Sequence, residues 1–190
     1  MRRTLLILAI ALGCGCSKRG ANGGFGGSTH VEPDTRPAFV LDASKPFVIE
    51  FGRGSGQEGL GVVKVTETGE VALHRIADGA RIESASLRLS DAQVRELTSV
   101  VNSSQLTRMG RSYSTDIQDG TQWVLWIQQS PLEKSIYFNN AFPQDITAFA
   151  DRLDAMLQQA GLSAASWTAV PEKQGRDEQD ALWARIQPPG

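Results

Sequence analysis

Three residue types that carry much of protein chemistry are scarce in this 190-residue chain, which contains two histidines, two cysteines and two tyrosines. Both cysteines, Cys14 and Cys16, lie near the N-terminus. The rest of the chain therefore has no cysteine with which to build a disulfide framework or a thiolate metal site. The histidines, His30 and His74, belong to no metal-binding motif. The sequence thus indicates no metal site and no cofactor.

An excess of charge of one sign is also missing. Lysine and arginine total 19, aspartate and glutamate total 21, and the formal net charge is −2. Nucleic-acid-binding proteins normally carry a clustered basic surface, so we expect no nucleic-acid partner. The apolar fraction of 41% is that of an ordinary globular domain.

Long hydrophobic runs are absent, and the most apolar stretch is Thr4–Leu12. It is much shorter than the roughly 20 residues of a membrane-spanning helix. Because Arg2 and Arg3 precede it and small residues follow it, the segment is typical of a secretory signal. A plain secretory signal with incidental cysteines is the alternative to the lipoprotein signal considered next.

The stretch Ala11–Cys14 resembles the bacterial lipobox, in which the cysteine receives a diacylglyceryl thioether and becomes the mature N-terminus. This resemblance implies a lipoprotein signal peptide over 1–13 and lipidation at Cys14, with Cys16 as the alternative site. Palmitate-type acyl chains would then anchor the protein to a membrane of the cell envelope, facing the periplasm or the exterior. Gly15, rather than aspartate, follows Cys14, which slightly favours the outer membrane.

The remaining chain divides by composition. Residues 14–46 are rich in glycine, serine and proline and predict a flexible tether. Residues 47–161 alternate in the manner of strands and contain two helical patterns, at 91–102 and from Pro143 to Gly161. We therefore expect an α+β domain, a mainly antiparallel sheet of about five to seven strands with two principal helices on one face. Residues 162–190 predict a tail with a short amphipathic helix.

A glycine-rich segment, Gly54–Gly59, matches the G-x-G-x-x-G pattern of dinucleotide-binding loops. That mechanism requires a helix directly after the loop, because the helix N-terminus binds the pyrophosphate. Here a strand pattern follows, at Val62–Thr66. The segment is better interpreted as the loop of a hairpin.

Catalytic candidates are few. His74 lies in a predicted strand, and Asp116 and Asp119 flank a predicted turn. An envelope hydrolase that uses His74 with Asp116 or Asp119 is the alternative function, although neither a nucleophile elbow nor a cysteine nucleophile accompanies these residues. Turn-forming aspartates and a structural histidine explain the same residues without catalysis.

Aromatic residues give a second set of candidates. Trp123 and Trp126 occupy opposite faces of one predicted strand, and Tyr113 and Tyr137 are expected nearby. Exposed aromatic side chains anchor protein partners or stack on sugar rings. The alternative is that they pack on both faces of a covered sheet or beneath Trp183.

The pattern from Gly61 to Leu157 is similar to a small domain of unknown function in predicted bacterial lipoproteins. The matching features are a hairpin at Val65–Val71, a helix after Leu89-Ser90, Tyr113 followed by Asp119-Gly120, and a helix after Phe142-Pro143. The resemblance implies no catalytic residues. We therefore expect a lipid-anchored envelope protein with a non-catalytic binding or structural domain, whose partner is an envelope protein or a cell-wall component.

Overall fold

The computed structural model describes residues 28–55, 59–77, 81–117 and 120–186. Within these ranges the chain forms one nine-stranded sheet with the order β1-β6-β8-β7-β2-β3-β4-β5-β9. All neighbouring strands are antiparallel except β6 and β8. The α+β class is confirmed, and the sheet has more strands than the five to seven expected. The strands are β1 (His30–Glu32), β2 (Val48–Ser55), β3 (Gly59–Thr66), β4 (Glu70–Ala77), β5 (Arg81–Arg88), β6 (Ser112–Ser114), β7 (Thr121–Gln129), β8 (Leu132–Asn139) and β9 (Thr168–Ala169).

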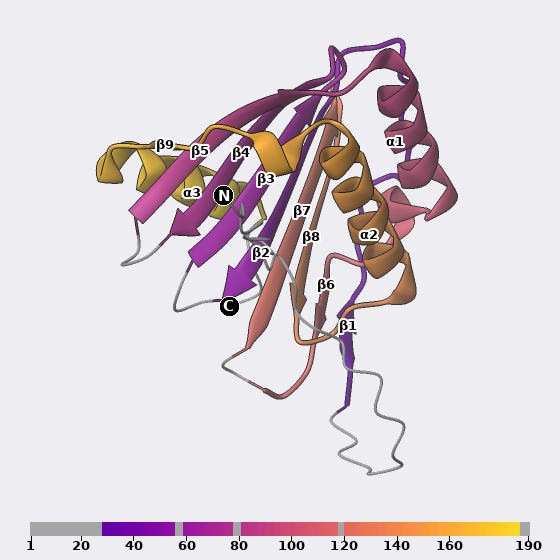
Figure 1. Ribbon diagram of the computed structural model, residues 1–190. Helices are drawn as coiled ribbons and strands as arrows, with labels where there is room; N and C mark the ends of the chain where they lie inside the picture. The colour runs from indigo at the N-terminus through magenta and orange to yellow at the C-terminus, as the bar shows by residue number, and fades with distance from the viewer. Residues whose placement is uncertain (1–27, 56–58, 78–80, 118–119, 187–190) are drawn as a thin grey trace, which may run out of the picture.

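Helices α1 (Asp91–Ser103) and α2 (Gln144–Gln159) pack side by side on one face of the sheet, as predicted (Figure 1). Ser90 caps α1 and forms a reciprocal capping box with Gln93, which satisfies free N–H groups at the helix start. The apolar stripe of α2 is buried against the sheet. The main core therefore lies between these two helices and the alternate strand residues that point toward them.

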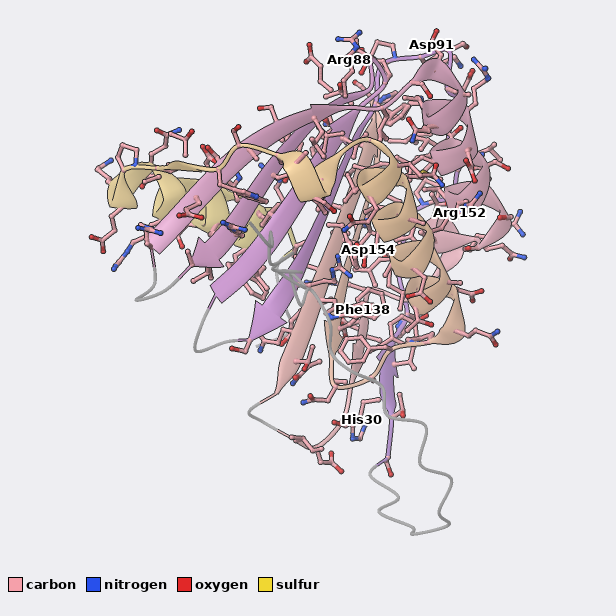
Figure 2. All side chains as sticks on the ribbon, viewed as in Figure 1. His30, Arg88, Asp91, Phe138, Arg152 and Asp154 are labelled. Atoms are coloured by element: carbon pink, nitrogen blue, oxygen red, sulfur yellow. The ribbon has the colours of Figure 1, made fainter. Side chains whose placement is uncertain are left out.

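Strand β2 contributes both buried apolar side chains and a charged side chain to the face of the sheet that α1 and α2 cover. Ile49 and Phe51 are each 1% exposed and face the helices. Arg53, two residues further along, donates two hydrogen bonds to Asp154 of α2, at 2.8 and 2.6 Å. Figure 2 shows Asp154 on the side of α2 that faces the sheet. A bidentate pair of this kind fixes the helix in register over the strand.

The segment before β2 differs from the flexible tether expected over 14–46. Its described part, from residue 28, runs along the domain and begins with β1 at the sheet edge. Leu41 is 2% exposed, and its backbone N–H and C=O pair with the side chain of Asn102 at 2.9 Å each. Composition alone missed these contacts because they join residues far apart in sequence.

A buried charge cluster holds the same segment against β8. The Lys134 side chain is 3% exposed, and its Nζ lies 2.8 Å from Asp34 Oδ2. Arg36 donates to both Asp34 oxygens and to Ser135 Oγ. Because an unpaired buried charge is strongly unfavourable, Lys134 requires the carboxylate that the N-terminal segment brings to it.

The second face of the sheet is covered by α3 (Glu172–Ile186), which lies on the opposite side from α1 and α2 (Figure 1). The chain reaches this face by way of β9, which pairs with β5 at the other sheet edge. Gly175, Leu182 and Ile186 are the buried residues of α3. The tail thus contains a helix, as predicted, but one of 15 residues that belongs to the domain.

We predict that Asp34→Asn lowers the free energy of unfolding by about 2–4 kcal/mol, because it leaves Lys134 buried without a counter-charge. Urea unfolding followed by circular dichroism would measure the change. Glu133→Gln is the matched control, because Glu133 is half exposed and lies 3.7 Å from Arg36. Its effect should stay within about 0.5 kcal/mol, and equal losses in both variants would contradict the assignment.

The same carboxylate makes stability depend on pH. Burial alone would raise the pKa of Asp34, but hydrogen bonds from Arg36 and Lys134 outweigh burial and hold its pKa well below the usual 3.8. A carboxyl whose pKa is lowered by folding stabilises the protein above its unfolded pKa, and this contribution is lost as the pH falls toward the folded pKa. Between about pH 5 and pH 2, wild-type stability should therefore fall more steeply than that of Asp34→Asn.

Candidate functional site

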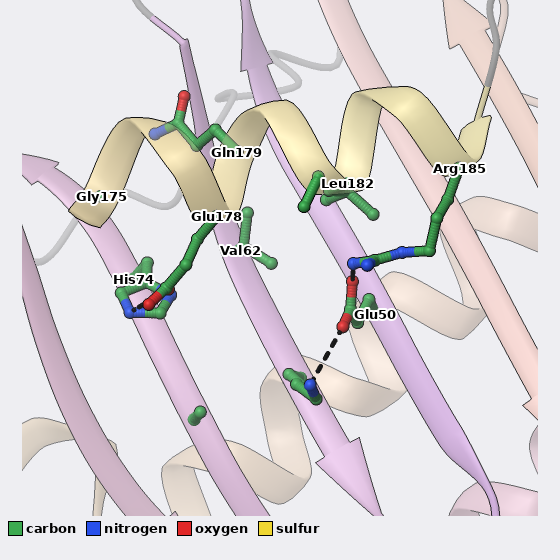
Figure 3. Close-up of a pocket in the computed structure, with 11 residues that line it drawn as sticks. Glu50, Val62, His74, Gly175, Glu178, Gln179, Leu182 and Arg185 are labelled. Carbon is green, nitrogen blue, oxygen red and sulfur yellow. Dashed lines mark hydrogen bonds and ion pairs between the residues drawn. The ribbon is translucent and has the colours of Figure 1, made fainter. Parts of the chain in front are cut away.

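A groove of about 360 Å³ lies where α3 crosses the second face of the sheet. Its floor is formed by β2, β3 and β4, and α3 forms one wall (Figure 3). Ion pairs occupy its two ends, one at Glu50 and one at His74, and Val62 lies between them. The groove gathers charged side chains from three strands and from α3 around one hollow, and we take it as the candidate functional site.

Glycines allow α3 to approach the sheet closely enough to form this wall. A Cβ at Gly52 would lie 2.7 Å from Val124 Cγ2 and 3.4 Å from Leu182 Cδ2. A Cβ at Gly175, on the helix, would lie 2.5 Å from Ile82 Cδ1. These positions have no room for a side chain, which explains glycines on both sides of the contact.

The G-x-G-x-x-G segment has the role of a hairpin, as predicted, because β3 begins at Gly59 and pairs with β2. The glycine-dense region is nevertheless mostly strand, since β2 continues to Ser55. Gly59, at φ +85°, contacts Gln179 of α3, whose side-chain amide donates to the Leu60 carbonyl at 3.3 Å. Close approach to α3 accounts for Gly59, and close approach to the Gly59 backbone, 1.9 Å from a Cβ at that position, accounts for Gly54.

One end of the groove is a triad of charges around Glu50. The Glu50 side chain is 6% exposed and accepts from Arg185 of α3. Its second partner is Lys64 Nζ, 3.3 Å from Oε1. The Arg185 guanidinium also lies over the Trp126 ring, 4.7 Å from its centroid. This cation–π contact and the ion pair together hold the C-terminal half of α3 on the sheet.

The other end is a histidine–carboxylate pair. His74 Nε2 lies 3.0 Å from Glu178 Oε2 of α3. The structure does not bring His74 together with Asp116, because four strands separate β4 from β6 in the sheet, a distance of more than about 20 Å. Asp116 instead contacts His30 at 2.8 Å, at the exposed end of β1 labelled in Figure 2. Asp119 lies outside the described residues.

The four aromatic candidates do not share one surface. Trp126 and Tyr137 are 7% and 9% exposed and pack beneath α3, where Tyr137 meets the Trp183 ring at 6.0 Å. Burial raises the pKa of the Tyr137 phenol. Trp123 and Tyr113 are partly buried on the opposite face, against the main core. The arrangement corresponds to packing on both faces of a covered sheet.

Apart from His74, the charged residues of the groove could not be identified as a site from sequence pattern. Glu178 and Arg185 lie in a polar tail whose position on the sheet cannot be deduced from local pattern. Glu50 did carry a signal, because it is a carboxylate within the apolar run Phe47–Phe51. Such a residue in a central strand must either face solvent or be buried with a partner.

The lipidation candidates Cys14 and Cys16 lie outside the described residues. In the part of the chain that is described, no helix is long and apolar enough to cross a membrane. The same residues contain no cluster of three or more His, Cys, Asp or Glu side chains able to hold a metal ion.

Compared with known proteins, the chain matches no protein-family model and no curated protein sequence. The fold and the groove therefore define it as an α+β protein with a helix-walled, mixed-charge groove on one sheet face.

We predict that Gly52→Ala destabilises the protein by about 1–3 kcal/mol, because the added methyl group overlaps Val124 beneath α3. Gly61→Ala is the matched control in the adjacent strand, since its Cβ would meet nothing closer than 3.5 Å. Thermal unfolding should show a lower Tm for the first variant and an unchanged or higher one for the second. A similar response in both would argue against the close contact of α3.

Proposed function

We propose that this protein is a lipid-anchored protein of the cell envelope whose α+β domain binds a partner without catalysing a reaction. The partner is an envelope protein or a cell-wall component, and the groove beside α3 is its binding site. The leader supports the location, because a basic start, a short apolar run and a lipobox-like cysteine occur together.

The observation that carries the binding role is the chemistry of the groove. Nucleophilic catalysis activated by a histidine requires a nucleophilic side chain that hydrogen-bonds to the imidazole, and a group that orients the imidazole. Glu178 meets the second requirement. Ser84 is the residue opposite His74 on β5, but no hydrogen bond joins the two side chains among the described contacts. Mixed charges around an apolar floor are instead typical of a recognition site.

The place where the N-terminal segment joins the sheet is compatible with a domain that is tethered at its N-terminus. The N-terminal segment enters the sheet through β1 at one edge. The groove lies beside β2, β3 and β4, and three strands, β6, β8 and β7, separate β1 from β2. An anchor at Cys14 would therefore leave the groove accessible.

The anchor is tested by subcellular fractionation. We expect wild type in the membrane fraction and Cys14→Ser in the soluble fraction, because without the thioether no acyl chain is attached. Cys16→Ser is the control and should remain with the membrane. Unchanged membrane association of Cys14→Ser, with release of Cys16→Ser, would assign the lipid to Cys16; association of both single variants would contradict a lipid anchor at either site.

The groove is tested by site-specific photo-crosslinking in intact cells. Ala181 is exposed and lines the groove, whereas Ala184 is exposed on the same helix and lines none of the described cavities. A benzophenone amino acid at position 181 should form a discrete adduct that position 184 does not form. Equal labelling at both positions would contradict binding in the groove.

A further inference from the structure

We propose that the groove binds the zwitterionic backbone of a short peptide, with the peptide carboxylate at Lys64 and Arg185 and its ammonium group at Glu178. This inference rests on the proposed function and specifies the chemical class of its ligand. It is drawn from the distribution of charge in the groove, from the spacing of the charged residues and from the character of the floor between them.

The end of the groove at Glu50 carries a net positive charge. Two cations, Lys64 and Arg185, share the single carboxylate of Glu50. The Lys64 side chain is 49% exposed, and its ammonium has three N–H donors, of which Glu50 takes one. A carboxylate placed beside Glu50 would therefore find a free donor and a surplus of positive charge.

The opposite end has a net negative charge when histidine is counted as neutral. The Glu178 side chain is 42% exposed, and its oxygens accept from His74 and from Gln174 of the same helix. Each carboxylate oxygen has two acceptor sites, so lone pairs remain for an incoming ammonium group. His74 holds the carboxylate over the groove and thereby positions the negative charge.

The two ends of the groove rise from neighbouring positions on β3 and β4. Val62 pairs with His74 and Lys64 pairs with Ala72, so Lys64 and His74 are diagonal neighbours on the sheet. The Cα atoms of such neighbours lie about 7–8 Å apart, so the strand positions at the two ends are separated by about the length of two extended residues.

The floor also favours small side chains. Lys64 and His74 each have an apolar residue directly opposite on the neighbouring strand, Ala72 and Val62 respectively. Both apolar residues line the groove. This leaves a small apolar patch between the charged ends, as Figure 3 shows for Val62. Dialanine, which has two free termini and two methyl groups, is therefore the probe of choice.

The experiment compares dialanine with two blocked forms by isothermal titration calorimetry on the purified protein. N-acetyl-dialanine lacks the ammonium group, and dialanine amide lacks the carboxylate. We expect dialanine to bind about tenfold more tightly than either, because each blocked form loses one charge-assisted contact. Equal affinity for the three compounds, or no detectable binding of dialanine, would overturn the proposal.

Two variants assign the ends separately. In Lys64→Met the remaining cation, Arg185, is balanced by Glu50, so this variant should lose most of its preference for dialanine over the amide while still discriminating against the acetylated form. Glu178→Gln should bind dialanine and N-acetyl-dialanine equally well while still discriminating against dialanine amide. Glu172→Gln is the control, because Glu172 lies on α3 outside the groove in an exposed pair with Arg176, and should match wild type. Discrimination that persists in Lys64→Met and Glu178→Gln would place the peptide elsewhere and overturn the assignment.

The outcome is distinguishable from failure of the proposed function. A specific crosslink at position 181 without selectivity for dialanine would retain the groove as a binding site and reject a zwitterionic peptide as its ligand. Selectivity for dialanine without a crosslink in cells would support the peptide site and count against a large partner there.

Discussion

The alternation of side chains along β2 is the constraint on which both layers of the protein depend. β2 pairs with β3 on one side and β7 on the other, and so joins the two halves of the sheet. Ile49 and Phe51 face α1 and α2, while Glu50 and Gly52 face α3. A slip of one residue in its pairing would place Glu50 in the main core and Phe51 beneath α3. Register at this strand therefore determines the core and the groove together.

A buried carboxylate on a sheet face restricts what can cover it. Glu50 retains its charge at low cost only while cations lie beside it, and α3 supplies one of them through Arg185. The helix is otherwise polar, and few of its residues are buried. Its position is thus specified by Glu50, by the glycine contacts and by the hydrophobic cluster to which Leu182, Ile186 and Trp183 contribute.

Sequence pattern predicted the helices and strands that are stabilised by contacts between residues close together in the sequence. The helix after Ser90, the helix after Pro143 and the hairpin at Val65–Val71 were each predictable because the interacting residues lie within one helix or one hairpin. The strands β1 and β9 are too short to carry periodicity and exist through pairing with distant partners. The groove was missed for the same reason, because its two sides come from residues more than a hundred positions apart, such as Glu50 and Arg185.

Both margins of the sheet end in very short strands. β1 has three residues and β9 has two, and β9 pairs only with Glu83 and Ser84 of the eight-residue β5. A long unpaired margin can recruit a strand from another molecule and start aggregation, whereas a short one gives an incoming strand too few hydrogen bonds. Among the described residues, β9 thus covers only part of the β5 margin, and lateral pairing between two copies of this protein would begin at the remaining residues of β5.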